Sequence, residues 1–177
     1  MERRAKVFIA GSRRLSRLSG EVLRQIDNVL NEGCTVLIGD ANGVDKAVQS
    51  YLSAKQYPEV VVFCVEGKWR NNVGNWPVKS IEAADVSQED SDYFSAKDRV
   101  MARECEYGFL IWDGRSPGTL TNMIDLMKEA KPIIVYVTRQ KRFYTLWTSE
   151  DLGKMLETVA PQALRGVEEE LNVFAMA

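Results

Sequence analysis

The chain has 177 residues, of which 45% are hydrophobic, and its formal net charge is −2. This length and apolar content exclude a disordered or collagen-like class and predict one domain over residues 1–177. The balanced charge gives no bulk electrostatic support for binding long nucleic acids, because such binding rests on many Lys and Arg contacts to phosphate. Nucleic acid is therefore not a favoured partner.

The sequence contains no histidine. Ser-His and Cys-His nucleophiles and His-based metal sites are therefore excluded, and we predict neither a metal nor a cofactor. The three cysteines, Cys34, Cys64 and Cys105, lie far apart in apolar contexts. We expect them to be small buried side chains in a protein from a reducing compartment, rather than disulfide partners.

No segment has the length of a signal or membrane sequence. The N-terminal stretch MERRAKVFIAG holds a four-residue apolar run, and the longest such run is VVVFCV, residues 60–65. Both are too short for a signal-peptide core or a membrane span. The sequence therefore predicts a cytoplasmic protein that does not enter a membrane.

Apolar runs alternate with segments of helical periodicity. The runs are KVFIAG (6–11), TVLIGD (35–40), VVVFCV (60–65), YGFLIW (107–112) and PIIVYVT (132–138). The helical patterns cover about 20–32, 44–52, 91–106, 120–127 and 149–159. Solidly apolar strands indicate burial on both faces, as in parallel sheets between helices. We predict an α/β, Rossmann-like, doubly wound and mainly parallel sheet of about five strands flanked by helices.

Three segments lie outside this alternation. Residues 66–90 are rich in Asn, Gly, Trp and Lys and are predicted to form a long loop. RFYTLW, residues 142–147, is compatible with an extended conformation. Residues 148–177 are predicted to form a helical C-terminal extension, in which Pro161 starts or breaks the final helix.

The loops after the first four strands carry the candidate ligand contacts. In a doubly wound sheet, ligands bind beyond the carboxyl ends of the strands, so these loops converge on one rim. Their sequences combine glycine with hydroxyl, amide and basic side chains. They are GSRR (11–14), GDANGVD (39–45), EGKWRNNVGNW (66–76) and DGRSPGT (113–119).

The first two loops suit a phosphate and a sugar. The planar guanidinium of Arg13 fits a phosphate, although GSRR could also be an ordinary tight turn. Asp40 and Asp45 could bind a ribose hydroxyl or only cap the following helix. The candidate ligand contacts in these loops are Gly11, Ser12, Arg13, Gly39, Asp40 and Asp45.

The stretch WDGRSPGT, residues 112–119, precedes a predicted helix. Its glycines clear space at the strand end, and its hydroxyls lie where a helix N-terminus exposes amides that suit an anion. The alternative is a capped loop without a ligand, with Trp112 packed in the core instead of stacked on a base. The candidate ligand contacts here are Trp112, Gly114, Ser116, Gly118, Thr119 and Asn122.

Two further groups complete the predicted site. Arg70, Asn71 and Asn72 could close over the ligand from the long loop. In the helical stretch KDRVMARE, Lys97 and Met101 are four residues apart and share a face, with Asp98 beside them. A solvated charged helix is the alternative for this stretch.

The motifs together resemble a known family. The dinucleotide fingerprint GxGxxG and the P-loop motif are both absent. GSR, GDANGVD, KDRVM and WDGRSPGT resemble the SLOG superfamily, which includes the LOG-type proteins and the Rossmann-like domain of DprA. RNNVGNW, KDRVMARE, YGFLIWDGRSPGTLTN and RFYTL resemble a set of small bacterial members. The resemblance covers about residues 5–157 and implies a Rossmann-like fold that often forms dimers, so we expect a homo-oligomer.

The resemblance also implies a nucleotide-like ligand. Some members cleave the N-glycosidic bond of nucleoside monophosphates and carry an Arg on the helix and a PGGxGTxxE motif. Here the Arg position is Lys97 and the Glu position is Asn122. An oxocarbenium-like transition state needs a nearby carboxylate, so these differences favour binding over cleavage.

Three functions follow, in order of preference. The first is a sensor or holding domain for a nucleotide or nucleotide-derived small molecule. The second is an N-glycoside hydrolase or transferase, with Asp98 or Asp113 as nucleophile or general base. The third is binding of single-stranded DNA by analogy with DprA.

Overall fold

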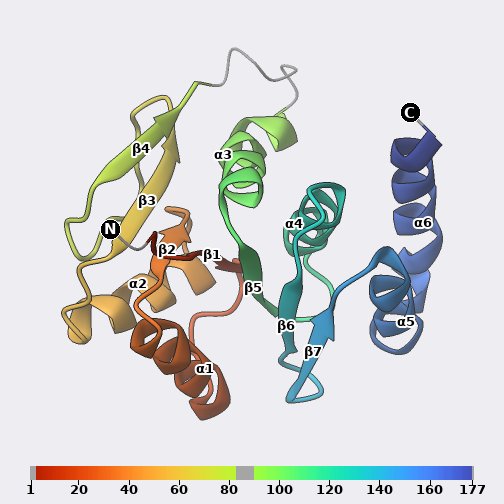
Figure 1. Ribbon diagram of the computed structural model, residues 1–177, viewed down its shortest axis with the longest axis horizontal. Coiled ribbons are helices and arrows are strands. Elements are labelled where there is room, and N and C mark those ends of the chain that lie inside the picture. The colour runs from red at the N-terminus through yellow and green to blue at the C-terminus, as the bar shows by residue number, and fades with distance from the viewer. Residues whose placement is uncertain (1–2, 83–89, 177) are drawn as a thin grey trace.

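Seven strands form one sheet in the computed structural model, which describes residues 3–82 and 90–176 (Figure 1). The strand order is β4-β3-β2-β1-β5-β6-β7, and all neighbours are parallel except β6 and β7. The chain therefore runs from β1 to one edge through β4 and then returns to β5 beside β1. The strands are β1 (Lys6–Gly11), β2 (Thr35–Ile38), β3 (Val60–Val65), β4 (Val78–Ile81), β5 (Tyr107–Trp112), β6 (Ile133–Val137) and β7 (Arg142–Leu146).

The prediction of an α/β, mainly parallel sheet is confirmed, but the number of about five strands was too low. Strand β4 lies inside the segment 66–90 that was predicted to be a loop, and β7 lies in the RFYTLW stretch. Both are edge strands, and most of their residues are exposed or half-buried. A search for solidly apolar runs finds only strands that are buried on both faces, so it misses β4, and RFYTLW was expected to be compatible with an extended conformation without being counted as a strand.

Helices cover both faces of the sheet. α1 and α2 pack on one face, and the core there includes Val22, Ile26 and Val48. α3 to α6 pack on the other face (Figure 1), where Met101 and Leu126 are fully buried. The helices are α1 (Gly20–Asn31), α2 (Val44–Ala54), α3 (Asp90–Glu104), α4 (Pro117–Lys128), α5 (Ser149–Val159) and α6 (Pro161–Met176).

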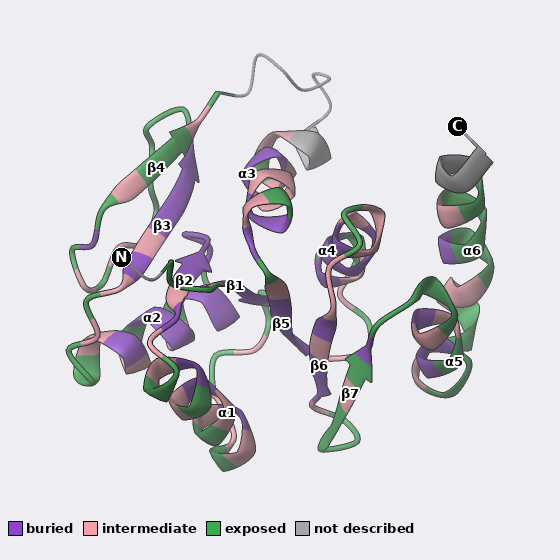
Figure 2. Cartoon of the chain, in the orientation of Figure 1, coloured by how far each residue is buried: buried purple, intermediate pink, exposed green. Residues whose placement is uncertain are grey.

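Strands with both faces buried divide their side chains between the two cores. In β1, Phe8 points to the α3–α6 side, and its neighbours Val7 and Ile9 point to the other side. Figure 2 shows the central strands buried along their length, whereas exposed residues concentrate on the outer helices and edge strands. The alternation of strand side chains explains why the runs are apolar at every position.

The C-terminal helices pack on the same core. Thr148 and Asp151 form a capping box at the start of α5. The side chain of Thr148 accepts a hydrogen bond from the N–H of Asp151, and the side chain of Asp151 accepts one from the N–H of Thr148. Leu152 and Val167 place α5 and α6 in the same apolar cluster as α3 and α4. The two helices thus cover residues 149–159 and 161–176 and pack on the core of the sheet.

The three cysteines are buried and free, as the sequence predicts. Cys34 and Cys105 belong to the two apolar cores, and burial raises the pKa of Cys105 to about 11. Within residues 3–82 and 90–176, no helix has the length and apolar character needed to cross a membrane.

Candidate functional site

A cavity of about 870 Å³ lies at the carboxyl ends of β1, β2, β5 and β6. The chain reverses its direction of strand addition between β1 and β5, so the cavity sits at the topological switch point of the sheet. Its volume lies within the range of small-molecule sites, roughly 300–1,000 Å³. Position and size both mark it as the candidate site.

Many of the sequence-based candidates meet in this cavity. They come from the ends of β1, β2 and β5, from the start of α4 and from α3, which are far apart in the sequence. Their roles in binding a ligand stay predictions. Those that line the cavity are Gly11, Arg13, Gly39, Asp45, Lys97, Asp98, Asp113, Ser116, Gly118, Thr119 and Asn122.

Four other candidates lie behind the cavity wall. Ser12 is fully buried, and its hydroxyl accepts a hydrogen bond from the N–H of Asp113 at 3.2 Å, which ties the end of β1 to the end of β5. Met101 and Trp112 belong to the apolar core. Gly114 has a φ of 82° and faces Arg139 and Val159. Packing and turn geometry account for these positions.

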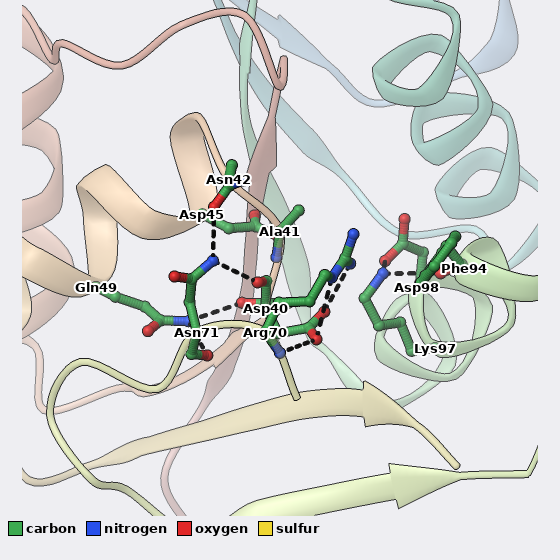
Figure 3. A network of polar contacts seen from close by, with 11 residues as sticks. Asp40, Ala41, Asn42, Asp45, Gln49, Arg70, Asn71, Phe94, Lys97 and Asp98 are labelled. Atoms are coloured by element: carbon green, nitrogen blue, oxygen red, sulfur yellow. Dashed lines mark hydrogen bonds and ion pairs between the residues drawn. The ribbon is translucent and has the colours of Figure 1, made fainter. Parts of the chain in front are cut away.

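The RNN motif, residues 70–72, holds the neighbouring loops together through hydrogen bonds (Figure 3). Arg70 forms an ion pair with Asp40 at 2.8 Å, and its backbone N–H also donates to Asp40 at 2.9 Å. Asn71 donates to the carbonyl oxygen of Asp40 and to Asn42. Asn72 bonds the backbone of Trp76. These side chains have partners within the protein and do not line the cavity, so their closure over a ligand stays a prediction.

The buried amide of Gln49 joins the same two loops (Figure 3). Its Nε2 donates to the carbonyl oxygens of Gly39 and Asn71, and its Oε1 accepts from the N–H of Val73. A fully satisfied buried amide holds both loops in one geometry. The segment after β3 is therefore a fixed support for the β2–α2 loop.

Arg70 also determines the protonation of Asp40. Burial alone would raise the pKa of Asp40, but hydrogen bonds and the charge of Arg70 outweigh it and lower the pKa below its usual 3.8. On its other side, Arg70 lies over the ring of Phe94 at 4.5 Å, and Arg13 approaches the same ring at 5.7 Å. Asp40 is thus an ionised residue engaged by Arg70, and it does not line the cavity.

The acidic end of the cavity lies at β2. Asp45, in the first turn of α2, accepts a hydrogen bond from the N–H of Ala41 at 3.1 Å. Lys97 is buried in α3, where it donates to the carbonyl oxygen of Phe94 and forms an ion pair with Asp98 at 3.3 Å (Figure 3). Burial raises the pKa of Asp45 to about 7; Lys97 opposes this shift and Asp98 adds to it. Burial therefore favours the protonated form of Asp45 up to about neutral pH.

Asp113 is held by backbone N–H groups of its own loop. Its Oδ1 accepts hydrogen bonds from the N–H groups of Arg115 at 2.9 Å and Ser116 at 2.7 Å. Burial tends to raise the pKa of Asp113, but these two backbone hydrogen bonds and that of Ser12 lower it overall. The ionised carboxylate therefore shapes the loop before α4, and its geometry does not mark it as a group that exchanges protons.

The opposite end of the cavity is cationic. Arg115 and Arg139 line it beside the first turn of α4, where backbone N–H groups lack intrahelical acceptors. Thr119 is 2% exposed, and its hydroxyl oxygen is buried with no hydrogen-bond partner within residues 3–82 and 90–176. Buried polar atoms are nearly always satisfied, so this hydroxyl is an exception at a residue that lines the cavity.

Comparison with solved structures identifies proteins of similar fold. The fold resembles that of DNA processing protein A (DprA). The DprA structure from Helicobacter pylori aligns with a TM-score of 0.58 and 19% identity, covering 86% of this chain and 72% of that chain. That protein binds single-stranded DNA. At this identity the match shows a similarity of fold alone. No protein-family model and no curated protein matches the chain.

The cavity is also lined by residues that were not predicted from the sequence. Arg14 and Arg115 lie in the loops after β1 and β5, but they were not among the predicted ligand contacts. Thr138 and Arg139 follow β6, and the rule that ligands bind at strand ends was applied only to the first four strands. The same rule, extended to PIIVYVT, would have found them. Among the described residues, no cluster of acidic and Cys side chains could hold a metal ion.

Proposed function

We propose that the cavity binds a nucleotide or nucleotide-derived small molecule, with its phosphate at the start of α4. The observation that carries this proposal is the buried, unpartnered hydroxyl of Thr119 at the start of that helix. A helix N-terminus attracts an anion because its free N–H groups and its dipole both favour negative charge. The hydroxyl of Thr119 adds a further donor at the same place.

The surrounding charges support a phosphate in particular. Arg13, Arg14, Arg115 and Arg139 all line the cavity. Guanidinium groups bind phosphate oxygens in pairs of parallel hydrogen bonds, which makes arginine well suited to this ligand. Gly118, where an added Cβ would meet no atom within 4 Å, leaves the approach to the helix open.

The proposal predicts binding of nucleotides by the purified protein. Isothermal titration calorimetry and thermal-shift measurements would use nucleoside mono- and diphosphates, cyclic nucleotides, ADP-ribose and inorganic phosphate. We expect at least one nucleotide to bind and raise the melting temperature, and the parent nucleoside without phosphate to bind more weakly. If no member of this panel binds at millimolar concentration, the proposed function is wrong.

The Thr119→Val variant gives effects of opposite sign on stability and binding. Because the hydroxyl has no partner in the free protein, an isosteric apolar side chain leaves the free energy of unfolding unchanged or raises it by up to about 1 kcal/mol. The same change removes a donor to the ligand and weakens nucleotide binding by about 10-fold. Urea unfolding and calorimetry measure the two effects. Thr121→Val, at an exposed position of α4, is the control. Lower stability with unchanged affinity would assign Thr119 a structural role instead.

A catalytic function is the second candidate, and the buried Asp45 favours it. An acid with a pKa of about 7 in a ligand cavity suits general acid–base catalysis. Among the earlier candidates, Asp98 lines the cavity as a partner of Lys97, whereas Asp113 is engaged by backbone amides. Chromatography of nucleoside monophosphates incubated with the protein would detect released base. Release abolished in Asp45→Asn would support hydrolysis, and no release from any substrate would exclude it.

The third candidate function is binding of single-stranded DNA. The fold neighbour supports it, although the balanced net charge of this chain does not. The H. pylori protein binds single-stranded DNA. Here the same arginines that line the cavity could contact a nucleic-acid backbone. A gel shift with an oligonucleotide that weakens steeply with salt would support this role, since counterion release makes such binding salt-dependent. Absence of a shift at low salt would exclude binding of single-stranded DNA.

A further inference from the structure

The acidic end of the cavity identifies the sugar of the ligand. We infer that Asp45 and Lys97 together recognise vicinal hydroxyl groups, so that the cavity selects ribonucleotides over 2′-deoxyribonucleotides. This inference rests on the proposed function, because it assigns a site to the sugar of the same nucleotide. It concerns the residues at the end of β2 and on α3.

Asp45 is held with one oxygen engaged. Its Oδ2 accepts from the N–H of Ala41, and an added Cβ on Gly39 would come within 2.7 Å of that oxygen. The same Cβ would lie 3.2 Å from Cε of Lys97. The missing side chain at Gly39 therefore makes room for Asp45 and Lys97 to meet beside the strand end.

The charges around Asp45 leave it without a dedicated cation. Three carboxylates gather here, those of Asp40, Asp45 and Asp98, and each acts on the others or on Lys97 (Figure 3). Arg70 pairs with Asp40, and Lys97 pairs with Asp98. In the described part of the chain, no ion pair within 4 Å involves Asp45. Asp45 lines the cavity, so a bound ligand can supply further hydrogen bonds to this carboxylate.

Hydroxyl groups suit the charges around Asp45 and Lys97 better than an anion or a cationic amine does. A phosphate would be repelled by the carboxylates, and a cationic amine would face the buried Lys97. The ammonium of Lys97 has three donors, of which one bonds Phe94 and one pairs with Asp98. A vicinal diol can donate to Asp45 and accept from Lys97 at the same time. An amino group of a base can only donate.

The topology separates this end from the phosphate end. Asp45 and Gly39 follow β2, whereas Arg139 follows β6, and β1 and β5 lie between them. Neighbouring strands are about 4.8 Å apart, so the two ends differ by three strand spacings. A nucleotide can therefore place its phosphate beside Arg139 and its sugar hydroxyls beside Asp45.

The test compares sugars while the base and the phosphate stay fixed. Calorimetry at pH 8, where Asp45 is ionised, measures adenosine, guanosine, cytidine and uridine 5′-monophosphates against their 2′-deoxy forms. We expect the ribonucleotide to bind about 10- to 100-fold more tightly, because the site leaves polar groups unpaired with the deoxy form. Asp45→Asn should reduce the ratio to below about 3-fold while deoxynucleotide affinity changes little. Glu157→Gln, exposed on α5, should keep the wild-type ratio.

The possible outcomes separate the inference from the proposed function. If none of the eight monophosphates binds, the failure belongs to the proposed function. If ribo and deoxy forms bind equally to the wild-type protein, the sugar assignment is wrong and the phosphate site stands. A preference that follows the base and ignores the sugar would likewise overturn the assignment. The wild-type ratio needs no variant, so the test does not depend on the folding of Asp45→Asn.

Discussion

Nucleotide affinity falls at least about 100-fold when Arg115 and Arg139 are both replaced by Glu. Each charge-assisted hydrogen bond to phosphate contributes roughly 1.5–3 kcal/mol, and reversing the charge adds repulsion. Both side chains line the cavity beside the start of α4, and both are exposed, so the fold should keep its stability. Calorimetry with the tightest-binding nucleotide of the panel measures the loss.

The control for this pair is Arg24→Glu, which changes the same charge at an exposed position of α1 away from the cavity. Its affinity should stay within about 3-fold of the wild-type value, because charges farther away than a Debye length, roughly 8 Å in physiological salt, are screened. A double variant that still binds as tightly as the wild-type protein would show that the phosphate lies elsewhere.

The second large effect is a gain of stability in Asp45→Asn that grows with pH. Burial raises the pKa of Asp45 from 3.8 to about 7, so between these values the folded protein holds a proton that the unfolded chain has lost. The wild-type protein therefore loses stability as the pH rises through this window, whereas the neutral amide does not. We expect the advantage of Asp45→Asn to grow by roughly 2–3 kcal/mol between pH 5 and pH 8.

Urea unfolding at four pH values between 5 and 8 measures this effect. Asp113→Asn provides a control of opposite sign, because the loop amides favour the ionised form of Asp113 and lower its pKa. Its substitution should reduce stability by the same amount at every pH between 5 and 8, because both pKa values of Asp113 lie below this window, and the loss should shrink only below about pH 4. A pH-independent difference between wild type and Asp45→Asn would contradict the buried, proton-holding state of Asp45.

A stabilising substitution in a cavity is itself informative. If Asp45→Asn is more stable but loses its preference for ribonucleotides, the carboxylate is kept at a cost in folding energy for the sake of binding. Such trade-offs between stability and function concentrate at sites where charged groups are desolvated for a ligand. A residue that served only the fold would show a loss of stability on substitution.

The site shows where sequence reasoning succeeds and where it stops. The rule that ligands bind at strand ends correctly brought together Gly11, Gly39 and Gly118, because parallel strands carry their following loops to one edge. The rule could not separate Asp40 from Asp45. Both follow β2, but Arg70 reaches Asp40 across 30 residues of sequence and leaves Asp45 facing the cavity.

The sequence by itself determined the α/β class, the central parallel strands and the rim of the candidate site, because apolar runs and loop composition are local properties of the chain. Only the tertiary structure decided the edge strands β4 and β7, the partners of the RNN motif and the unpartnered hydroxyl of Thr119. Edge strands lack a continuous apolar run, and an ion pair or an unmet hydrogen bond depends on residues that are distant in sequence. The raised pKa of Asp45 also depends on the tertiary structure, because its carboxyl group is desolvated only when α2, α3 and the end of β2 pack together.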